Sequence, residues 1–413
     1  MHRMKETFII VGAGHAAGQA AATLRQKGFE GRIVVIGDEP WIPYQRPPLS
    51  KKFLSGGLEI EHLYFKPESF YPECEIDLVL STRVAEINTD TKVIRTTDGV
   101  TMEYKKLLLT TGSRVCEIPV PGTDLGGVHY LRKISDVTAI QEEFLEGSRL
   151  VIVGAGYIGL EVAAVAVKHG IDVTILEAQK RALSRVTAPE VSKFFERVHQ
   201  ANGVKLEFGR IVRELSGHNK LEKVVCTDGS EFTADLAIVG IGIIPNIELA
   251  EGAGISCDNG IVVNEFCETS APDVYAAGDC TFHPNGYYGR CVRLESVHNA
   301  LEQSKSAAAA MCGEPVAYTQ IPWFWSDQYD IKLQIAGLNQ GYDQVVIRGN
   351  RDTNSFAAFY LQDRRLLAVN AINSPREFML GKKLISAFAR LSPEDLADTE
   401  NDIKQLATAS LVN

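Results

Sequence analysis

Two short glycine-rich stretches are the residues of this chain whose types and spacing best indicate chemistry. They read GAGHAA over residues 12–17 and GAGYIG over residues 154–159. Each follows an apolar run and precedes an alanine-rich segment, which is the pattern of a strand, a tight turn and a helix. Backbone N–H groups at the beginning of such a helix attract phosphate groups. We therefore expect two pyrophosphate-binding loops in one chain.

The first loop contains the residue types that such a turn needs. Gly12 allows the tight turn, Gly14 lets the backbone approach a phosphate, and Ala17 is small enough for close helix–strand packing. After the next apolar run, Asp38 or Glu39 supplies a carboxylate that could bind ribose hydroxyls.

The second loop carries the full fingerprint, and an acidic residue follows it at the expected distance. Glu177 ends the next apolar run, where a carboxylate accepts hydrogen bonds from both ribose hydroxyls. The same carboxylate repels a 2′-phosphate, so we expect NADH to be preferred over NADPH. Lys180 and Arg181 follow closely and could weaken that preference.

A third signal is the apolar run that ends in Gly278-Asp279. Alone, this dipeptide would more often be a simple turn. After two nucleotide loops, it predicts a carboxylate at the edge of a sheet where ligands of such folds bind.

The elements that must position these residues repeat along the chain. Residues 7–37 and residues 149–177 each predict a β-α-β unit, and each is followed by a β-rich segment with an Asp-Gly turn, at Asp98-Gly99 and Asp228-Gly229. The prolines of residues 41–51 argue against any regular element there.

The later part of the chain differs from these repeats. We expect a helix over about 296–311 and then a β-rich, aromatic segment from Pro322, which includes the run 323–337. Two closing helices are expected near Glu377–Leu391 and Asn401–Ala409. This last segment is interpreted as an α+β domain.

Composition narrows the function classes. The 413 residues are 45% apolar and 23% charged, with a net charge of −10 and no Lys/Arg-rich run, which argues against nucleic acid as a partner. No apolar run is long enough to span a membrane, and no targeting segment is recognised, so a cytoplasmic location is expected. The eight cysteines are scattered without a C-x-x-C pair, which indicates mostly buried free thiols rather than a metal or dithiol site.

The order of these motifs resembles the FAD-dependent ferredoxin reductases of the glutathione reductase fold. Besides the two loops, the resemblance includes PYQRPPLSK (residues 43–51), RVTAPEVS (185–192), GIGIIPN (240–246), RLESVHNALEQ (293–303) and PWFWSDQYD (322–330). It implies an α/β fold with two Rossmann-like, three-layer ββα dinucleotide-binding domains and a C-terminal α+β domain. The implied boundaries are 1–117 with 246–321 for FAD, 118–245 for NAD and 322–413 for the last domain.

The resemblance also implies non-covalent FAD at the first loop and NADH at the second. The residues implied for FAD are Gly12, Gly14, Ala16, Ala17, Asp38, Glu39, Arg46, Lys51, Val84, Thr111, Gly112, Arg132, Asp279, Val297 and Trp325. Those implied for NAD are Gly154, Gly156, Tyr157, Ile158, Gly159, Glu161, Glu177, Arg185 and Gly242. No metal site is expected.

Three of these residues are expected to act in catalysis. Lys51 would favour the anionic reduced flavin and could pair with Glu161, which could reach the nicotinamide carboxamide. Trp325 matches the aromatic residue beside the flavin, and in a strand Trp323 would lie on the same face. His298 stands where a similar member of the family has proline; it could meet the edge of the flavin ring or the partner protein, and it is assigned to neither.

The resemblance also indicates how electrons leave. Dithiol members of the fold carry a redox pair of cysteines near the flavin, and peroxidase-type members carry a single one. The corresponding residues 47–54 contain no cysteine here, so electrons should pass directly from the flavin to a 2Fe-2S ferredoxin. That ferredoxin would feed a cytochrome P-450 or a Rieske-type oxygenase. It would dock weakly on a basic patch, for which the candidates are Lys305, Lys332, Lys382, Lys383 and Lys404. We expect a monomer or a weak dimer.

Two alternatives stay open on the sequence. A rubredoxin reductase or an NADH oxidase could use the same scaffold. A redox-sensing interaction protein of the apoptosis-inducing-factor type could also carry these motifs, although the lack of a recognised targeting segment counts against it.

Overall fold

The computed structural model describes residues 6–405, and the contacts of the chain divide it into two compact units. Unit 1 comprises Met1–Gln45, Ile60–Arg114 and Ile244–Pro322. Unit 2 comprises Arg46–Glu59, Val115–Ile243 and Trp323–Asn413. The chain passes from one unit to the other after Gln45, Glu59, Arg114, Ile243 and Pro322. The short strands β8 (Ser113–Val115) and β17 (Ile243–Pro245) each include one of these boundaries. The three-domain boundaries expected from the sequence stay a prediction.

Unit 1 is built on a parallel sheet with the strand order β20-β7-β1-β2-β3. Its strands are β1 (Thr7–Val11), β2 (Arg32–Ile36), β3 (Ile76–Val79), β7 (Lys106–Leu109) and β20 (Val274–Ala276). The central strands are continuous apolar runs because both faces of a parallel sheet are covered.

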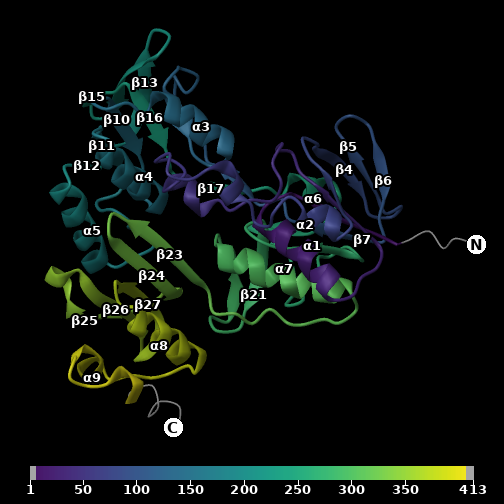
Figure 1. Cartoon of the computed structure of the whole chain (residues 1–413). Coiled ribbons are helices and arrows are strands. Elements are labelled where there is room, and N and C mark those ends of the chain that lie inside the picture. Colours follow the sequence, from purple (N-terminus) through teal and green to yellow (C-terminus); the bar gives the residue numbers. More distant parts are fainter. Residues whose placement is uncertain (1–5, 406–413) are drawn as a thin grey trace, which may run out of the picture. The chain divides into compact units, whose positions relative to one another are not determined.

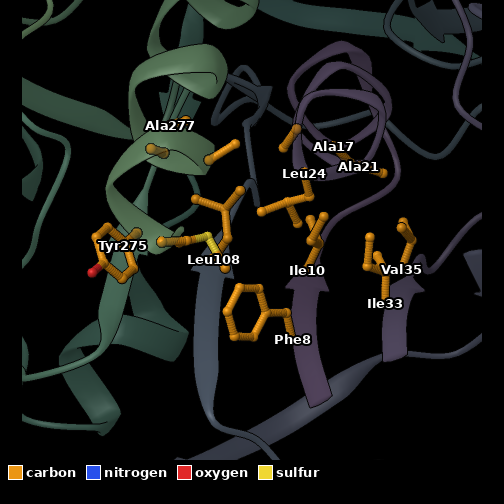
Figure 2. Close-up of a cluster of buried hydrophobic side chains, with 14 of the residues drawn as sticks. Phe8, Ile10, Ala17, Ala21, Leu24, Ile33, Val35, Leu108, Tyr275 and Ala277 are labelled. Carbon is orange, nitrogen blue, oxygen red and sulfur yellow. The ribbon is translucent and has the colours of Figure 1, made fainter. Parts of the chain in front are cut away.

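Two alanine-rich helices lie side by side in unit 1, α1 (His15–Gln26) and α7 (Val297–Met311) (Figure 1). Small side chains let them approach each other and the sheet closely. Figure 2 shows Ala17 and Leu24 above Ile10 and Leu108, all of them buried in one cluster. This packing places the first turn of α1 at the carboxyl end of β1.

The rest of unit 1 consists of small elements around that sheet. They are the sheet β4-β5-β6 (Val84–Asn88, Val93–Thr96, Thr101–Glu103), the sheet β18-β19-β21-β22 (Cys257–Asp258, Gly260–Val262, Thr281–Asn285, Arg290–Val292), α2 (Phe70–Glu73), α6 (Glu248–Gly252) and the 3-10 helix η2 (Ile60–Leu63).

Unit 2 contains a second parallel sheet, with the strand order β12-β11-β10-β16-β9. Its strands are β9 (Val128–Tyr130), β10 (Arg149–Val153), β11 (Asp172–Glu177), β12 (Lys205–Phe208) and β16 (Leu236–Val239), and its helices are α3 (Ile134–Glu143), α4 (Tyr157–Lys168) and α5 (Pro189–Ala201). A three-stranded antiparallel sheet, β13-β14-β15 (Val212–Gly217, Leu221–Cys226, Glu231–Thr233), follows.

The two sheets repeat the same loop connections. Gly12 donates to Ile36 O and Gly154 donates to Leu176 O, each at 2.8 Å. The repeat expected from the sequence is therefore present down to single backbone hydrogen bonds.

The last part of unit 2 is an antiparallel sheet with the order β23-β24-β27-β26-β25. Its elements are β23 (Trp323–Gln328), β24 (Ile331–Gly337), β25 (Gln344–Asn350), β26 (Ser355–Gln362), β27 (Arg365–Ile372), α8 (Pro375–Ser386), α9 (Pro393–Ala397) and the 3-10 helix η3 (Arg351–Thr353). The α+β character expected for this segment is confirmed.

The structure corrects several expected boundaries. The β-rich run 323–337 is a hairpin of β23 and β24, in which the chain turns at Tyr329 with φ of +56°. Residues 41–51 contain the 3-10 helix η1 (Pro47–Ser50), which tolerates proline in its first turn. The helix expected near Glu377–Leu391 is shorter at its C-terminal end: α8 covers Pro375–Ser386, and the separate helix α9 covers Pro393–Ala397. The expected helix Asn401–Ala409 runs into residues outside the described part.

The described residues carry two further findings. Between residues 6 and 405, no helix is long and apolar enough to cross a membrane, and no group of three or more His, Cys, Asp or Glu side chains could hold a metal ion. All eight cysteines are free, but only Cys226, Cys267 and Cys280 are buried, so the expectation of mostly buried thiols is wrong.

Candidate functional site

The first glycine loop has the geometry of a phosphate cradle. Gly12 has φ of +110°, and a Cβ there would lie 2.2 Å from Thr110 O, so only glycine fits. Gly14 precedes α1 without a side-chain cap, and a Cβ there would meet nothing within 4 Å. The loop therefore presents uncapped helix N–H groups to open space, which is what a pyrophosphate requires.

The Gly-Asp signal lies against the same helix. A Cβ on Gly278 would lie 3.4 Å from the Cβ of Ala16 and 3.8 Å from that of Ala300. The next residue, Asp279, accepts a hydrogen bond from Ser113 Oγ at 3.0 Å. Unit 1 thus brings Ala16 and Asp279 close to each other at the carboxyl edge of its sheet.

The other residues implied for FAD in unit 1 are spread over several elements. Glu39 accepts a hydrogen bond from Tyr44 Oη at 2.8 Å, and Asp38 is exposed just after β2. Thr111 Oγ1 donates to Asn246 O at 2.7 Å, and Gly112 has φ of +63°. Ala17 is buried in α1, Val84 is buried at the start of β4, and Val297 is half-buried in the first turn of α7.

The second loop repeats the cradle in unit 2. Gly154 has φ of +108°, and a Cβ there would lie 2.5 Å from Gly240 O. Gly156 precedes α4 without a side-chain cap and with nothing within 4 Å of its added Cβ. A Cβ on Gly159 would lie 2.2 Å from Gly154 O, so this glycine permits the close packing of α4.

Glu177 is held against this loop by backbone hydrogen bonds. Its Oε2 accepts from Ala155 N and its Oε1 from Gln179 N, both at 2.8 Å. These bonds leave further lone pairs for ribose hydroxyls. Arg181 instead donates to Ser184 O in its own loop and to Ser192 Oγ on α5, so its guanidinium is engaged by these two groups.

The remaining residues implied for NAD lie around α4. The ring of Tyr157 packs against that of Phe324 at a tilt of 41°, with 4.8 Å between ring centroids, and Ile158 is exposed. Arg185 donates to Ile241 O at 3.4 Å, and a Cβ on Gly242 would lie 3.9 Å from its Nη2.

Unit 2 contains a buried carboxylate that is surrounded by polar side chains. Glu161 is only 2% exposed, yet its oxygens accept three side-chain hydrogen bonds. Lys51 Nζ and Ser50 Oγ donate to Oε2 at 2.6 and 2.5 Å, and Ser326 Oγ donates to Oε1 at 2.6 Å. The charge of Lys51 and the two hydroxyls compensate a carboxylate that burial alone would not tolerate.

The segment that carries Lys51 is anchored at both ends. Arg46 Nη1 donates to Arg132 O at 2.7 Å, which brings together two of the residues implied for FAD. Gln141 Nε2, on α3, donates to Phe53 O at 2.6 Å. These bonds fix the residues on either side of the Lys51–Glu161 pair.

Two members of this cluster, Ser50 and Ser326, are not among the site residues expected from the sequence. Ser50 adjoins Lys51 within the motif PPLSK, so its place in that motif could have revealed it. Ser326 lies 165 residues from Glu161 along the chain, and nothing in the sequence marks its contact.

The two tryptophans of β23 lie on one face, as expected. The rings of Trp323 and Trp325 have centroids 5.5 Å apart. Phe378 of α8 packs against Trp323 at 5.8 Å. Arg46, Lys51, Arg132 and Trp325 belong to unit 2, whereas the other residues implied for FAD belong to unit 1.

The candidate docking lysines differ in their surroundings. Lys305 in unit 1 pairs with Glu302 at 2.5 Å. In unit 2, Lys332 on β24 and Lys383 on α8 are exposed, and Lys382 is half-buried. Lys404 is exposed near the end of the described residues.

Both glycine loops fit the dinucleotides that the sequence implies. In each loop, the first glycine has a positive φ and no room for a side chain. The second glycine precedes a helix without a side-chain cap, and a Cβ added there would occupy open space beside the helix N–H groups. Unit 1 adds the carboxylates of Asp279 and Glu39, and unit 2 adds that of Glu177.

Comparison with known proteins agrees with this geometry. The family model of the pyridine nucleotide-disulphide oxidoreductases matches residues 6–304, and a reductase C-terminal model matches residues 323–407. Putidaredoxin reductase CamA of Pseudomonas putida is 42% identical over 98% of this chain and 97% of its own length. Rhodocoxin reductase of Rhodococcus erythropolis is 40% identical over 96% of this chain and 93% of its own length.

A solved structure agrees at the level of the fold. The chain is similar to one in the covalent putidaredoxin reductase–putidaredoxin complex, with a TM-score of 0.96, 41% identity and 99% of each chain covered. The expected combination of a glutathione reductase-like fold with a C-terminal reductase domain is confirmed.

Proposed function

The chain belongs to the pyridine nucleotide-disulphide oxidoreductase family, as an FAD- and NAD(H)-dependent reductase of the ferredoxin reductase type, and we propose that NADH is its donor and a 2Fe-2S ferredoxin its acceptor. The solved relative is a complex of a reductase with putidaredoxin, which supports an iron–sulfur protein as the partner. The ferredoxin would in turn supply a cytochrome P-450 or a Rieske-type oxygenase.

The proposal rests mainly on the absence of cysteine from residues 47–54. Ser50 and Lys51 of this segment donate instead to the buried Glu161. No thiol in this segment can receive electrons, so in this proposal the electrons leave directly from the flavin. When bound, FAD accepts a hydride and releases electrons singly, which is what a one-electron acceptor needs.

We assign Lys51 and Glu161 complementary roles. Lys51 supplies a fixed positive charge that stabilises negative charge developing on the reduced cofactor. Glu161 holds that ammonium in place. Three of its lone-pair positions are occupied, which leaves one on Oε1 for a nicotinamide carboxamide N–H. Because Glu161 is almost fully buried, that contact requires neighbouring side chains to yield.

Trp325, with Trp323 beside it, provides an apolar, rigid surface on β23 in this proposal. Their ring contact and that of Trp323 with Phe378 restrict both indoles. Such a surface would exclude water from the reduced cofactor and so limit side reactions of that cofactor.

We further propose that the ferredoxin docks on the lysines of β24 and α8. Lys332, Lys382 and Lys383 share one antiparallel sheet and the helix packed on it. A weak, salt-sensitive complex is expected because electron-transfer encounters are brief.

The test is turnover with NADH and a panel of acceptors, measured anaerobically as cytochrome c reduction, together with oxygen consumption measured separately in aerated buffer. The purified holoenzyme should reduce a 2Fe-2S ferredoxin rapidly, and in aerated buffer without an acceptor protein it should consume oxygen slowly. A clear preference for rubredoxin, or fast oxygen consumption alone, would identify a rubredoxin reductase or an oxidase instead. Slow turnover with NADH-dependent dimerisation would indicate a redox sensor.

A further inference from the structure

A continuous line of buried hydrogen bonds leads away from Glu161. Ser326, whose Oγ donates to Glu161 Oε1, also accepts from Gln328 Nε2 at 3.1 Å. Gln328 Oε1 lies 2.9 Å from His199 Nε2, and His199 Nδ1 lies 3.1 Å from Tyr329 Oη. The line thus joins α4, β23 and α5.

The residues of this line are enclosed by protein. Ser326 and His199 are 0% exposed and Gln328 is 1% exposed. Only Tyr329, at the hairpin turn, is half-buried. A buried polar chain of this length is costly unless every member is satisfied, and here each member finds its partner inside the line.

The chemistry of the groups fixes the direction of every bond. The carboxylate can only accept, so Ser326 must donate to it and accept from the amide N–H of Gln328. The amide oxygen of Gln328 must then accept from the Nε2–H of His199. This tautomer leaves Nδ1 of His199 to accept from the hydroxyl of Tyr329.

The surroundings keep that arrangement in one protonation state. Burial lowers the pKa of His199 to about 4, and burial raises the pKa of the Tyr329 hydroxyl to about 12. Near neutral pH His199 is therefore neutral and Tyr329 retains its proton. A second proton on His199 would remove the acceptor of the Tyr329 hydroxyl and reverse that bond.

We propose that Gln328 and His199 are positioning residues, which hold the Ser326 hydroxyl on Oε1 of Glu161 and so fix the direction of its remaining lone pair. This inference rests on the proposed role of Glu161 towards nicotinamide. Neither residue would touch NADH or FAD. Their effect would pass through Ser326, which without Gln328 could rotate away from the carboxylate.

The first test is single-turnover reduction of the FAD-loaded enzyme by NADH in a stopped-flow instrument. His199→Met and Gln328→Met should each slow hydride transfer about fivefold, the effect of losing about one hydrogen bond. His199→Gln keeps a donor towards Gln328 Oε1 and should stay within about twofold of the wild type.

A double-mutant cycle separates this inference from the proposed role of Glu161. In the Glu161→Gln background, His199→Met should change hydride transfer less than about twofold, because its effect acts through Glu161. If Glu161→Gln alone leaves hydride transfer unchanged, the role of Glu161 is wrong. If Glu161→Gln slows it but His199→Met and Gln328→Met do not, the positioning inference is wrong.

A matched control is available in unit 1. His283 is 1% exposed, and neither ring nitrogen has a hydrogen-bond partner within the described residues. His283→Met therefore removes an equally buried imidazole without touching the line. It should leave hydride transfer within about twofold of the wild type even if it lowers the melting temperature.

A second readout does not depend on activity. In protein labelled with ¹⁵N-histidine, the resonances missing from His199→Gln identify His199. They should report the neutral Nε2–H tautomer at pH 6 and shift in Ser326→Ala, which removes a hydroxyl that His199 does not contact. An Nδ1–H tautomer or a doubly protonated ring at pH 6 would contradict the proposed direction of the bonds. Unchanged signals in Ser326→Ala would contradict the coupling along the line.

Discussion

Lys51 Nζ lies 2.6 Å from Oε2 of Glu161, and the glutamate side chain is almost completely withdrawn from solvent. The lysine side chain keeps 19% exposure, so the pair has one buried and one partly accessible end. A buried carboxylate needs its cation more than the cation needs the carboxylate. This asymmetry means that substitutions of the two residues should have different consequences.

Lys51→Met should slow reduction of the bound flavin by NADH about tenfold or more, because it removes a charge that stabilises the reduced state. It should also lower stability by about 3 kcal/mol, since Glu161 is left buried without a cation. Stopped-flow absorbance and urea unfolding measure the two effects. Lys52→Met is the matched control, because Lys52 is exposed next to it. Equal effects of the two substitutions would remove Lys51 from its role.

Glu177→Gln should reduce the preference for NADH over NADPH about tenfold, because a neutral amide no longer repels a 2′-phosphate. The measured quantity is the ratio of kcat/KM values for the two nucleotides. Glu177→Gln retains an acceptor for Ala155 N–H, so it changes charge while largely preserving the loop. Glu177→Ala should reduce the preference as well and also weaken NADH binding. An unchanged ratio in both variants would exclude Glu177 as the discriminating residue.

Alanine at Gly12 should lower stability, whereas alanine at Gly14 should weaken FAD binding without changing stability. Gly12→Ala forces a Cβ onto the carbonyl of Thr110 at φ of +110°, so the variant should be destabilised by several kcal/mol. Gly14→Ala meets no protein atom within 4 Å, so the melting temperature without cofactor should be unchanged. Its FAD dissociation constant should rise about tenfold or more, because the methyl group occupies the space that the phosphate needs. Unchanged FAD affinity in Gly14→Ala would place the pyrophosphate elsewhere.

The glycine loops could be predicted from the sequence because their function and their fold use the same few adjacent residues. The Lys51–Glu161 pair was predictable only through the family resemblance, since 110 residues separate its members. Ser326 and the line beyond it were not predictable, because long-range packing of β23 against α4 brings them there. The turn at Tyr329 carries no local sequence signal, because it contains no Asn-Gly or Asp-Gly pair and a tyrosine adopts the positive φ.

Stability should fall between pH 6.5 and pH 5 because of two buried histidines. Burial lowers the pKa of both His199 and His283 to about 4. Both stay neutral in the folded protein while the unfolded chain takes up protons below about pH 6.5. Their contribution is therefore complete above pH 6.5 and is lost as the pH falls towards 4, at up to about 1.4 kcal/mol per pH unit for each.

Urea unfolding of the wild type, His199→Gln and His283→Met at pH 7.5, 6 and 5 tests this prediction. Each variant should show a smaller loss of stability with falling pH than the wild type does. Carboxylates with lowered pKa values, such as Asp228 at about 2, remain ionised in this range and do not contribute. Identical slopes in all three proteins would show that these histidines are protonated in the folded state.

Charge reversal on α8 should weaken ferredoxin binding without affecting NADH. Lys382→Glu with Lys383→Glu should raise the KM for a 2Fe-2S ferredoxin about tenfold and leave the rate of flavin reduction by NADH unchanged. The salt dependence of that KM should also become weaker, because fewer charges are screened. Lys193→Glu with Lys220→Glu changes the net charge equally at exposed positions on α5 and the β13–β14 turn, and so controls for non-specific repulsion. A similar rise in KM for both double variants would show a general charge effect, and no rise in either would place the docking surface elsewhere.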